Sequence, residues 1–353
     1  MLFSAKSRPV LGLDITTSSV KLIEISMSGG QYRVESYAAE PTPPNSINEK
    51  AIVDANAVGD AIKRAVKRSG ARAKDAAVAI SGDAAITKVI QMPRTLSENE
   101  LEGQVEMQAD QYIPFPMEEV SFDYEVIGPS EKDPEMLDVL LVATRSENVE
   151  QRVAACAAAG LTARIVDVEA FALENACRLL THQMPDGGLG RVLAVVDFGA
   201  SSTTFSVLRD LKVIYTRDFA FGGQQLTEEV MRTYGLSMEE AGRAKKEGGL
   251  PGNYETEVLG PFIDDMCQQV SRSLQFFLAS GAGREQPEQI LICGGCANIP
   301  GAAEMIQSRV GIEALRGDPL GQMKVSQKAK AQSVKKDATA LLTACGLALR
   351  SFD

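Results

Sequence analysis

Two aspartates, Asp14 and Asp197, stand at the ends of apolar segments, and each is followed by serines at the fourth and fifth positions. The matching stretches read Leu11-Gly-Leu-Asp-Ile-Thr-Thr-Ser-Ser and Val195-Val-Asp-Phe-Gly-Ala-Ser-Ser. A carboxylate at the end of a buried strand costs free energy unless a cation compensates its charge. Hydrated Mg²⁺ suits such a pair, because it binds few carboxylates together with waters and substrate phosphates. We therefore predict that Asp14 and Asp197 hold magnesium through water.

The turn after each aspartate consists of small and hydroxyl-bearing residues. Small side chains let backbone N–H groups approach phosphate oxygens, and hydroxyls add donors. One such turn alone would be read more simply as a polar β-hairpin. Two copies, each followed by two further strands, indicate an internal duplication that binds phosphate. The predicted contacts are Thr16, Thr17, Ser18, Ser19 and Lys21 in the first copy, and Gly199, Ala200, Ser201 and Ser202 in the second.

A third glycine-rich segment follows an apolar strand that begins at Gln289. It contains a diglycine and leads to a helix expected to start at Pro300. Glycines at such a place let the backbone pack against a flat ligand such as a nucleoside, although an ordinary strand-to-helix turn fits equally well. We assign six residues to this side of the nucleotide site: Gly222, Gly223, Gly294, Gly295, Asn298 and Pro300.

The bulk composition limits the classes of partner. The net charge of −11 argues against nucleic acid as a main partner, because an acidic chain repels phosphate backbones. The segment Arg316–Lys336 is basic, with one acid, and reads as an exposed loop or, alternatively, a basic contact surface. No apolar run reaches the ~18 residues that span a bilayer. We expect a cytoplasmic protein without membrane insertion.

The six cysteines are scattered, and only Cys293 and Cys296 have the two-residue spacing of a redox or metal motif. No second pair completes a zinc site. Reduced, mostly buried thiols are therefore the favoured interpretation, with metal or redox chemistry as the alternative.

The apolar pattern predicts an α/β chain with two domains. Strands near 9–15, 20–26 and 32–39 precede a helix from about 54 to 70. The first domain is expected to comprise 1–81 and 167–182. An α+β subdomain, 82–166, is inserted into it. The second domain spans 190–353 and contains a helical subdomain at about 222–282.

These motifs occur in the order found in the superfamily of actin, sugar kinases and heat-shock chaperone ATPases. The segments 166–176 and 338–348 resemble its two connecting helices. The resemblance implies an actin-like, duplicated RNase H-like fold that binds ATP or ADP with Mg²⁺. One residue departs from the pattern: Thr16 stands where the first turn usually has glycine, so that turn must differ or tolerate strain. The segment Met238–Lys245 resembles the adenine-side helix and places Lys245 there, while Gly242 replaces the usual glutamate.

The position of the insertion resembles that of the cell-division protein FtsA and of PilM, a family of type IV pilus assembly proteins. Gln108–Glu119 is very similar to the PilM signature, and the last helix carries a core-like apolar stripe where FtsA has a membrane-binding tail. The resemblance implies a cytoplasmic adaptor, peripheral to the inner membrane, that binds the cytoplasmic N-terminus of PilN in the PilN/PilO complex. It further implies contacts with the pilus motor ATPases and platform protein, which drive twitching motility.

Two further sets of residues follow from this resemblance. Asp167 and Glu169 are the candidate catalytic carboxylates, with slow hydrolysis at most, although both also read as capping groups. Tyr112, Ile113, Pro114 and Phe115 are the candidate partner-binding residues, or else a helix end and a rigid turn. The alternatives to the adaptor are an FtsA-like filament-forming ATPase and a small-molecule kinase of the same fold.

Overall fold

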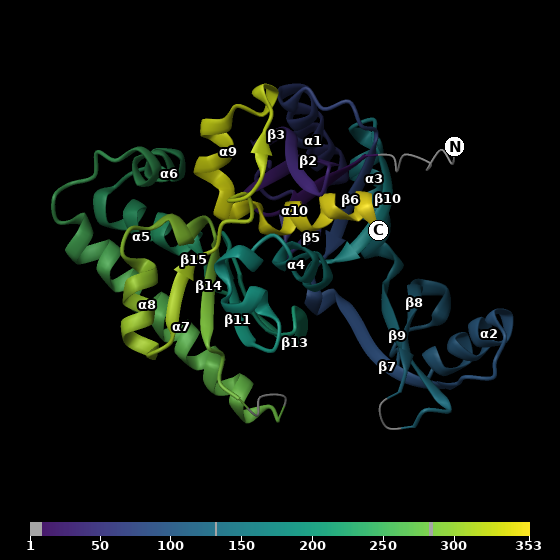
Figure 1. The fold of residues 1–353 in the computed structure, drawn as a ribbon. Coiled ribbons are helices and arrows are strands. Elements are labelled where there is room, and N and C mark those ends of the chain that lie inside the picture. The colour runs from purple at the N-terminus through teal and green to yellow at the C-terminus, as the bar shows by residue number, and fades with distance from the viewer. Residues whose placement is uncertain (1–8, 131–132, 282–284) are drawn as a thin grey trace.

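The computed structural model describes residues 9–130, 133–281 and 285–353. Residues 1–8 of the predicted first domain, 131–132 in the insertion and 282 of the predicted helical subdomain lie outside this part. Figure 1 shows two sheet-containing lobes side by side and a third, smaller lobe that projects from the first. The third lobe lies within the range 82–166 expected for the insertion, but residues 146–158 and 162–166 of that range belong to the first lobe, because they pack on its core and pair with its sheet.

The two large sheets have the same strand order, which confirms the duplicated α/β, actin-like fold. Five strands of the first run β3-β2-β1-β6-β10, with the short strand Lys324–Val325 added beside β3, and the second runs β13-β12-β11-β14-β15. In each, the first three strands are antiparallel and the last two pair in parallel. The strands are β1 Val10–Ile15, β2 Ser19–Ser28, β3 Gln31–Pro41, β6 Asp75–Ile80, β10 Thr162–Val168, β11 Val192–Phe198, β12 Thr203–Arg209, β13 Lys212–Phe219, β14 Gln289–Gly294 and β15 Glu313–Arg316.

Helices cover both sheets. In the first lobe α1 begins after Asp54, whose Oδ1 accepts a hydrogen bond from the Ala57 amide, and ends at Gly70 in the left-handed conformation. No helix in the described residues is long and apolar enough to cross a bilayer. The helices are α1 Ala55–Ser69, α2 Glu98–Ala109, α3 Ser146–Ala158, α4 Glu169–Cys177, α5 Gly223–Tyr234, α6 Met238–Glu247, α7 Gly260–Ala279, α8 Ala302–Val310, α9 Ala331–Asp337 and α10 Leu342–Leu349.

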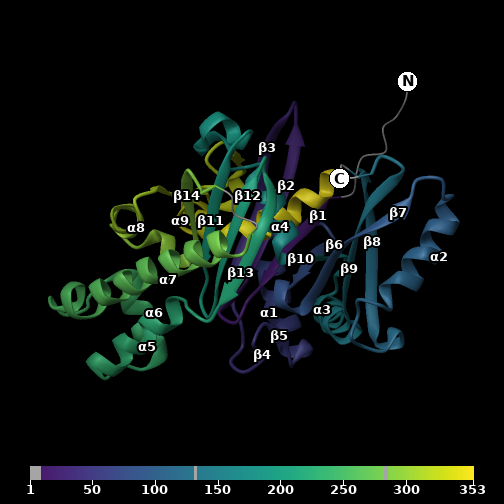
Figure 2. The same ribbon diagram turned by 90° about the horizontal axis from the view of Figure 1, so that it is seen from below.

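The insertion has a three-stranded antiparallel sheet of its own, in the order β7-β9-β8. Its strands are β7 Ala85–Pro93, β8 Val120–Pro129 and β9 Met136–Arg145. One face packs against α2 through Ile90, Leu141, Val105 and other apolar residues. Figure 2 shows α2 on the outer side of this sheet, with the opposite face turned toward the rest of the molecule.

The basic segment Arg316–Lys336 is not the loop that the sequence suggested. Its residues Lys324–Val325 form β16, which pairs in parallel with β3, and α9 begins at Ala331. Side-chain periodicity could not reveal a two-residue strand, since its pairing depends on β3, almost three hundred residues earlier. The second half of the chain therefore contributes a strand to the first sheet.

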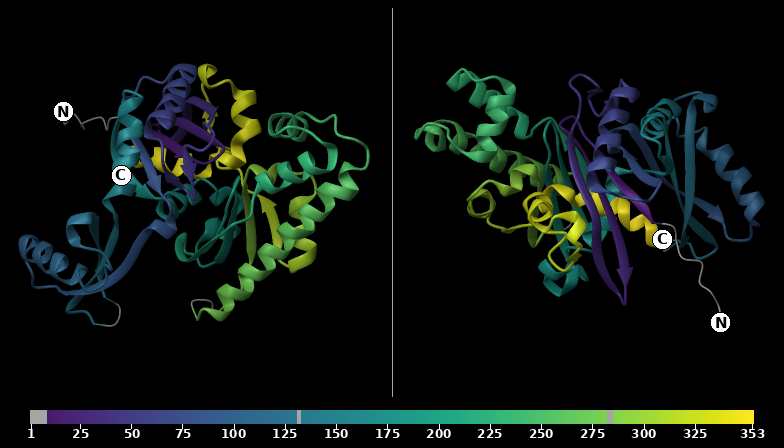
Figure 3. Two further views of the ribbon diagram at one scale, coloured as in Figure 1. Left: turned by 180° about the vertical axis from the view of Figure 1, so that it is seen from behind. Right: turned by 90° about the horizontal axis from the view of Figure 1, so that it is seen from above.

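Each of the two connecting helices packs against the sheet of the other half of the chain. The helix after the first sheet, α4, packs its Leu173 and Cys177 against Val195 and Leu291 of the second sheet. The helix after the second sheet, α10, packs its Ala344 and other small residues against Ile23 of the first. Both views of Figure 3 show α10 in yellow running beneath the purple strands. Sequence-contiguous domain boundaries therefore divide residues that share one core.

The crossing of α4 and α10 depends on a glycine. A Cβ atom on Gly346 would lie 1.7 Å from the carbonyl oxygen of Ala172, and one on Gly12 would lie 2.0 Å from that of Ala344. Only residues without a side chain allow the backbones to approach so closely. Layers β1, α10 and α4 are therefore stacked at the closest possible spacing.

We predict that Gly346→Ala destabilises the protein by at least about 3 kcal/mol, because the added methyl forces the two helices apart. The matched control is Gly103→Ala on the exposed side of α2, where a Cβ would meet nothing within 4 Å. That change should leave stability equal or raise it by about 1 kcal/mol. Urea unfolding of both variants measures the difference, and equal stability of the two would contradict the close packing.

Candidate functional site

The two predicted magnesium aspartates lie at the ends of β1 and β11, in the same cleft. Lys21 Nζ donates to Asp14 Oδ2 at 2.7 Å. Burial alone would lower the pKa of Lys21, but Asp14 and, more weakly, Asp197 raise it above its usual value. Burial and the nearby charge of Asp14 raise the pKa of Asp197 to about 6, against the lowering effect of Lys21. Asp197 is thus a carboxylate whose charge the protein compensates incompletely.

The two turns after these aspartates are closed by the same backbone hydrogen bond, which in the first turn the Thr16 amide donates to the Ser19 carbonyl at 3.1 Å. Thr16 Oγ1 accepts a hydrogen bond from the Ser19 amide at 3.2 Å and donates to the Ser19 carbonyl at 3.0 Å. In the second turn the Gly199 amide donates to the Ser202 carbonyl at 3.0 Å. Thr16 is not among the described non-glycine residues with positive φ. The expectation that the first turn must differ or tolerate strain is therefore wrong: Thr16 keeps the closing hydrogen bond of the second turn, and its hydroxyl adds two more without positive φ.

The tips of the two turns touch across the cleft. Thr17 Oγ1 and Ser201 Oγ lie 3.0 Å apart and share a hydrogen bond, although 184 residues separate them. The hydroxyls of the two copies thus converge on one point between the domains. A phosphate group at this point would receive donors from both domains.

The predicted nucleoside side comes together around the second turn. The Gly223 and Gln224 amides at the start of α5 donate to the Gly199 and Ala200 carbonyls at 3.0 and 2.8 Å. Lys245 Nζ, from α6, donates to the Gly223 carbonyl at 2.6 Å and to Thr227 Oγ1 at 2.7 Å. Burial lowers the pKa of Lys245. Lys245 therefore fixes α6 to the start of α5, beside Gly222.

The third glycine-rich segment closes the same side of the cleft. Gly294 has φ +85°, and a Cβ there would lie 2.2 Å from the Phe198 carbonyl and 2.5 Å from Asp197 Oδ1. Asn298 Nδ2 donates to Thr339 Oγ1 at 2.9 Å, and that hydroxyl donates to the Gly294 carbonyl at 2.9 Å. This chain of hydrogen bonds holds the diglycine against the end of β11, and the short helical turn Gly295–Asn298 follows before Pro300.

A cluster that the sequence did not reveal lies deeper in the cleft. Lys50 Nζ contacts Glu169 Oε2 at 3.0 Å and Asp218 Oδ2 at 2.6 Å. Burial alone would lower the pKa of Lys50, but the two carboxylates raise it above its usual value. A hydrogen bond with Asp218 raises the pKa of Asp83, at the entry to the insertion. A pocket of about 300 Å³ beside the cluster is lined by Asp83, Glu169 and Asp218 among others.

Lys50 reaches this cluster from a strained hairpin. The strands β4 Ile47–Asn48 and β5 Ala51–Ile52 are joined by Glu49 and Lys50, with φ of 45° and 67°. Two-residue turns of this kind favour Asn-Gly, because positive φ costs other residues about 1 kcal/mol or more. The sequence carries no such turn signal, and the segment reads only as a proline-rich connection. The strain places one ammonium between the two domains.

The two candidate catalytic carboxylates have different surroundings. Asp167 is buried, its Oδ2 accepts from Arg350 Nε at 2.7 Å, and its Oδ1 accepts from the Val168 amide. Both of its oxygens are therefore engaged within the protein. Glu169 faces the cleft, where burial raises its pKa to about 7 despite the opposing charge of Lys50. Of the two carboxylates, Glu169 is the one that lines the pocket beside Lys50.

The candidate partner residues divide in a similar way. Ile113 is buried in the core of the insertion, and Phe115 packs against the same core. Tyr112 remains 40% exposed, with Lys88 Nζ 5.4 Å from its ring centroid. Ile113 and Phe115 thus contribute to the core of the insertion, while Tyr112 and Pro114 are accessible.

All six cysteines are buried and free, as the composition suggested. Burial raises the pKa of Cys296 to about 11 and that of Cys293 well above its usual value. Thiols in this state are poor nucleophiles and poor metal ligands. Among the residues that the structure describes, no group of three or more His, Cys, Asp or Glu side chains could hold a metal ion by itself.

We predict that Lys50→Gly destabilises the protein by about 3 kcal/mol, although it relieves the positive φ, because it leaves Glu169 and Asp218 without their shared cation. Glu49→Gly is the matched control: it relieves the same strain and keeps the ammonium. It should be neutral or stabilising by about 1 kcal/mol. Chemical unfolding at pH 7 compares the two, and a stabilised Lys50→Gly protein would show that the bridge contributes nothing.

Comparison with known proteins identifies a family and two solved structures that this chain resembles. The family model described as "Type IV pilus assembly protein PilM" matches residues 12–352. The solved structure of a PilM-PilN type IV pilus biogenesis complex aligns with a TM-score of 0.80 and 28% identity, over 98% of this chain and 99% of that one. The ethanolamine utilization protein EutJ from Carboxydothermus hydrogenoformans aligns with a TM-score of 0.55 and 17% identity, over 96% and 89%. With its two matched sheets, paired turns and inserted lobe, the chain belongs to the PilM family of type IV pilus assembly proteins.

Proposed function

We propose that this protein is an ATP-binding, actin-like adaptor of the type IV pilus inner-membrane assembly complex. In this role it binds the cytoplasmic N-terminus of PilN and links it to the pilus motor. The observation that supports the nucleotide part is the meeting of Thr17 and Ser201, which brings two hydroxyl-rich turns from different domains to one point. The partner part is supported by the similarity to the PilM-PilN complex over nearly the whole chain.

The cleft suits a nucleotide with its phosphates between the two turns. Phosphate oxygens would take the place of the hydrogen bond between Thr17 and Ser201 and accept from both hydroxyls. The nucleoside would then lie toward Gly294, Gly295 and the start of α5. Lys245 is already held at that side by the Gly223 carbonyl.

The residues present also suit Mg²⁺. Asp197 has a pKa of about 6 because burial and Asp14 oppose its ionisation. A divalent cation near Asp14 and Asp197 would favour the ionised form of Asp197. Lys21 neutralises only one of the two charges. ATP or ADP with Mg²⁺ would supply the missing positive charge and the oxygen ligands that complete a six-coordinate shell.

We propose slow hydrolysis at most. Asp167 is held by Arg350, and Glu169 is paired with Lys50, so neither carboxylate is an unhindered base. A pKa of about 7 leaves Glu169 partly protonated at neutral pH. Bound nucleotide would thus act mainly by joining the two domains, and the adaptor would respond to its presence.

For PilN we propose the face of the inserted sheet that lies opposite α2. Strand alternation places Val89, Leu140 and Glu125 side by side on that face, since Val89 and Glu125 both pair with Leu140. Val89 is 49% exposed, and Asp123 and Glu125 are exposed beside it. Aliphatic and acidic groups together suit an extended peptide with apolar and basic side chains. Tyr112 and Pro114 would lie outside this contact.

A cytoplasmic location, with attachment to the inner membrane through protein partners, follows from this proposal. The resemblance to the PilM family further suggests the pilus motor ATPases and the platform protein as partners. Nucleic acid has no place in the proposal, because the chain carries a net charge of −11.

We predict that Asp197→Asn stabilises the free protein at pH 8 by about 2 kcal/mol and abolishes stabilisation by Mg-ATP. The folded-state pKa of about 6 exceeds the ordinary 3.8, so the wild type loses stability as pH rises through this interval. At pH 4 the two proteins should therefore be equally stable.

Thermal unfolding at both pH values, with and without Mg-ATP, measures these effects. Saturating ligand at 100 times its Kd should add about 2.7 kcal/mol to the wild type. The matched control is Asp265→Asn, an exposed carboxylate on α7, which should change neither quantity. Equal stabilisation of the wild type and Asp197→Asn by Mg-ATP would remove the nucleotide proposal.

We predict that Val89→Arg weakens binding of a synthetic PilN N-terminal peptide at least tenfold, because the guanidinium repels basic side chains and fills the apolar face. The matched control is Met107→Arg, a similarly exposed apolar residue on α2, at 59% exposure. It should bind like the wild type. Fluorescence anisotropy with labelled peptide, with and without Mg-ATP, compares the three proteins. Binding lost in Met107→Arg and kept in Val89→Arg would assign PilN to the α2 side.

A further inference from the structure

Two segments of this acidic chain contain basic residues and no acids. Residues 63–74 carry six lysines and arginines, and residues 324–336 carry five lysines. All eleven side chains are exposed. The segments are about 250 residues apart in sequence, and the net charge of the whole chain is −11. This concentration of positive charge contrasts with the net negative charge of the whole chain.

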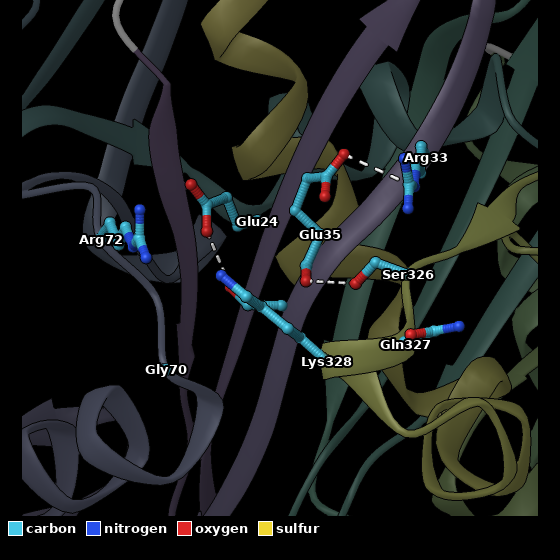
Figure 4. A pocket seen from close by; sticks show the side chains of 9 residues that line it. Glu24, Arg33, Glu35, Gly70, Arg72, Ser326, Gln327 and Lys328 are labelled. Carbon is cyan, nitrogen blue, oxygen red and sulfur yellow. Dashed lines mark hydrogen bonds and ion pairs between the residues drawn. The ribbon is translucent and has the colours of Figure 1, made fainter.

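The fold brings the two segments together. Pairing of β16 with β3 places Lys324 opposite Arg33. The Ser326 amide donates to the Val34 carbonyl at 2.8 Å, which fixes the following residues against the sheet. A pocket of about 420 Å³ then lies between the end of α1 and this strand, lined by Arg72 from the first segment and Lys328 from the second. Figure 4 shows Lys328 extending across the pocket, with Arg72 on one side and Arg33 on the other.

The positive charge of the pocket is only partly compensated. Arg33 Nε lies 3.6 Å from Glu35 Oε1, and Glu35 also accepts from Ser26 Oγ at 2.6 Å. Glu24, on the same wall, accepts from Ser36 Oγ at 2.8 Å. Within the described residues, Arg72 and Lys328 make no hydrogen bond or ion pair. Two cations from different segments thus face one pocket with their donors available.

We propose that this basic face, formed by residues 63–74 and 324–336 around the Arg72–Lys328 pocket, binds an acidic segment of a partner protein. Carboxylates of an extended chain would enter the pocket and receive charge-assisted hydrogen bonds from Arg72 and Lys328. The surrounding lysines would attract the segment over the Debye length of about 8 Å. This surface is separate from the nucleotide cleft and from the inserted sheet.

Two other polyanions fit the surface less well. A nucleic acid extends beyond the basic face and meets the acidic remainder of the chain. A membrane surface usually requires apolar side chains that insert beside the cations. The two basic segments contain no exposed large hydrophobic residue. A short acidic peptide needs neither a longer basic surface nor inserting apolar side chains, and it can enter a concave pocket.

The test measures binding of a fluorescein-labelled peptide, three repeats of Glu-Gly-Asp-Ser, to the full chain by anisotropy at about 50 mM salt. Three repeats of Gln-Gly-Asn-Ser provide the neutral control peptide. Arg72→Glu with Lys328→Glu should weaken binding of the acidic peptide at least tenfold. Arg232→Glu with Arg272→Glu, exposed cations of α5 and α7, changes the net charge equally and should bind within twofold of the wild type.

The milder pair Arg72→Gln with Lys328→Gln should give an intermediate loss, and it serves if the double reversal does not fold. Equal losses in both charge-reversed proteins would overturn the proposal, since net charge alone would then explain binding. Absence of binding by the wild type would overturn it as well. Sedimentation with vesicles of one part phosphatidylglycerol to three parts phosphatidylcholine tests the lipid alternative. Vesicle binding that requires Arg72 and Lys328, without peptide binding, would assign the face to a membrane.

Discussion

The stacking of β1, α10 and α4 is the constraint on which the architecture depends. Each connecting helix leaves one sheet and completes the core of the other, so neither domain has a complete core without both halves of the chain. The spacing is set by Gly346, whose place no residue with a side chain can take without moving Ala172. The two sheets are therefore joined at a fixed crossing while their strand ends remain on either side of a cleft. Asp14 and Asp197 oppose each other because of this geometry.

The arrangement of charges in the cleft follows from this stacking of β1, α10 and α4. The packing of the two domains brings together carboxylates of both. Among the described residues, these carboxylates are contacted by the ammonium groups of Lys21 and Lys50, both from the first domain. Lys21 forms an ion pair with Asp14, and Lys50 forms ion pairs with Asp218 and Glu169. The pKa values of Asp197 and Glu169 remain raised because burial and the neighbouring carboxylates outweigh the effect of these two ammonium groups. Such a site gains most from a ligand that brings its own cation.

The sequence predicted what depends on local pattern and on repetition. The duplicated strand–turn–strand unit at Asp14 and Asp197, the inserted subdomain and the glycine after β14 all carry signals within a short window. The exchange of α4 and α10 has no local signal, because an apolar helix reads the same whichever sheet it covers. Lys50 was missed since its Glu-Lys turn lacks the usual Asn-Gly. The ion pair of Asp167 could not be predicted either, because its partner Arg350 lies 183 positions away.

The domains touch at two levels, and the difference between the levels suggests how a bound nucleotide could reach the insertion. At the rim, Thr17 and Ser201 share a hydrogen bond across the domains, and a bound phosphate would take the place of this hydrogen bond. Deeper in, Lys50 holds Asp218, which also shares a hydrogen bond with Asp83. Asp83 lies two residues before β7, the first strand of the insertion. Both levels thus join the same two domains, and the deeper one lies next to the first strand of the insertion.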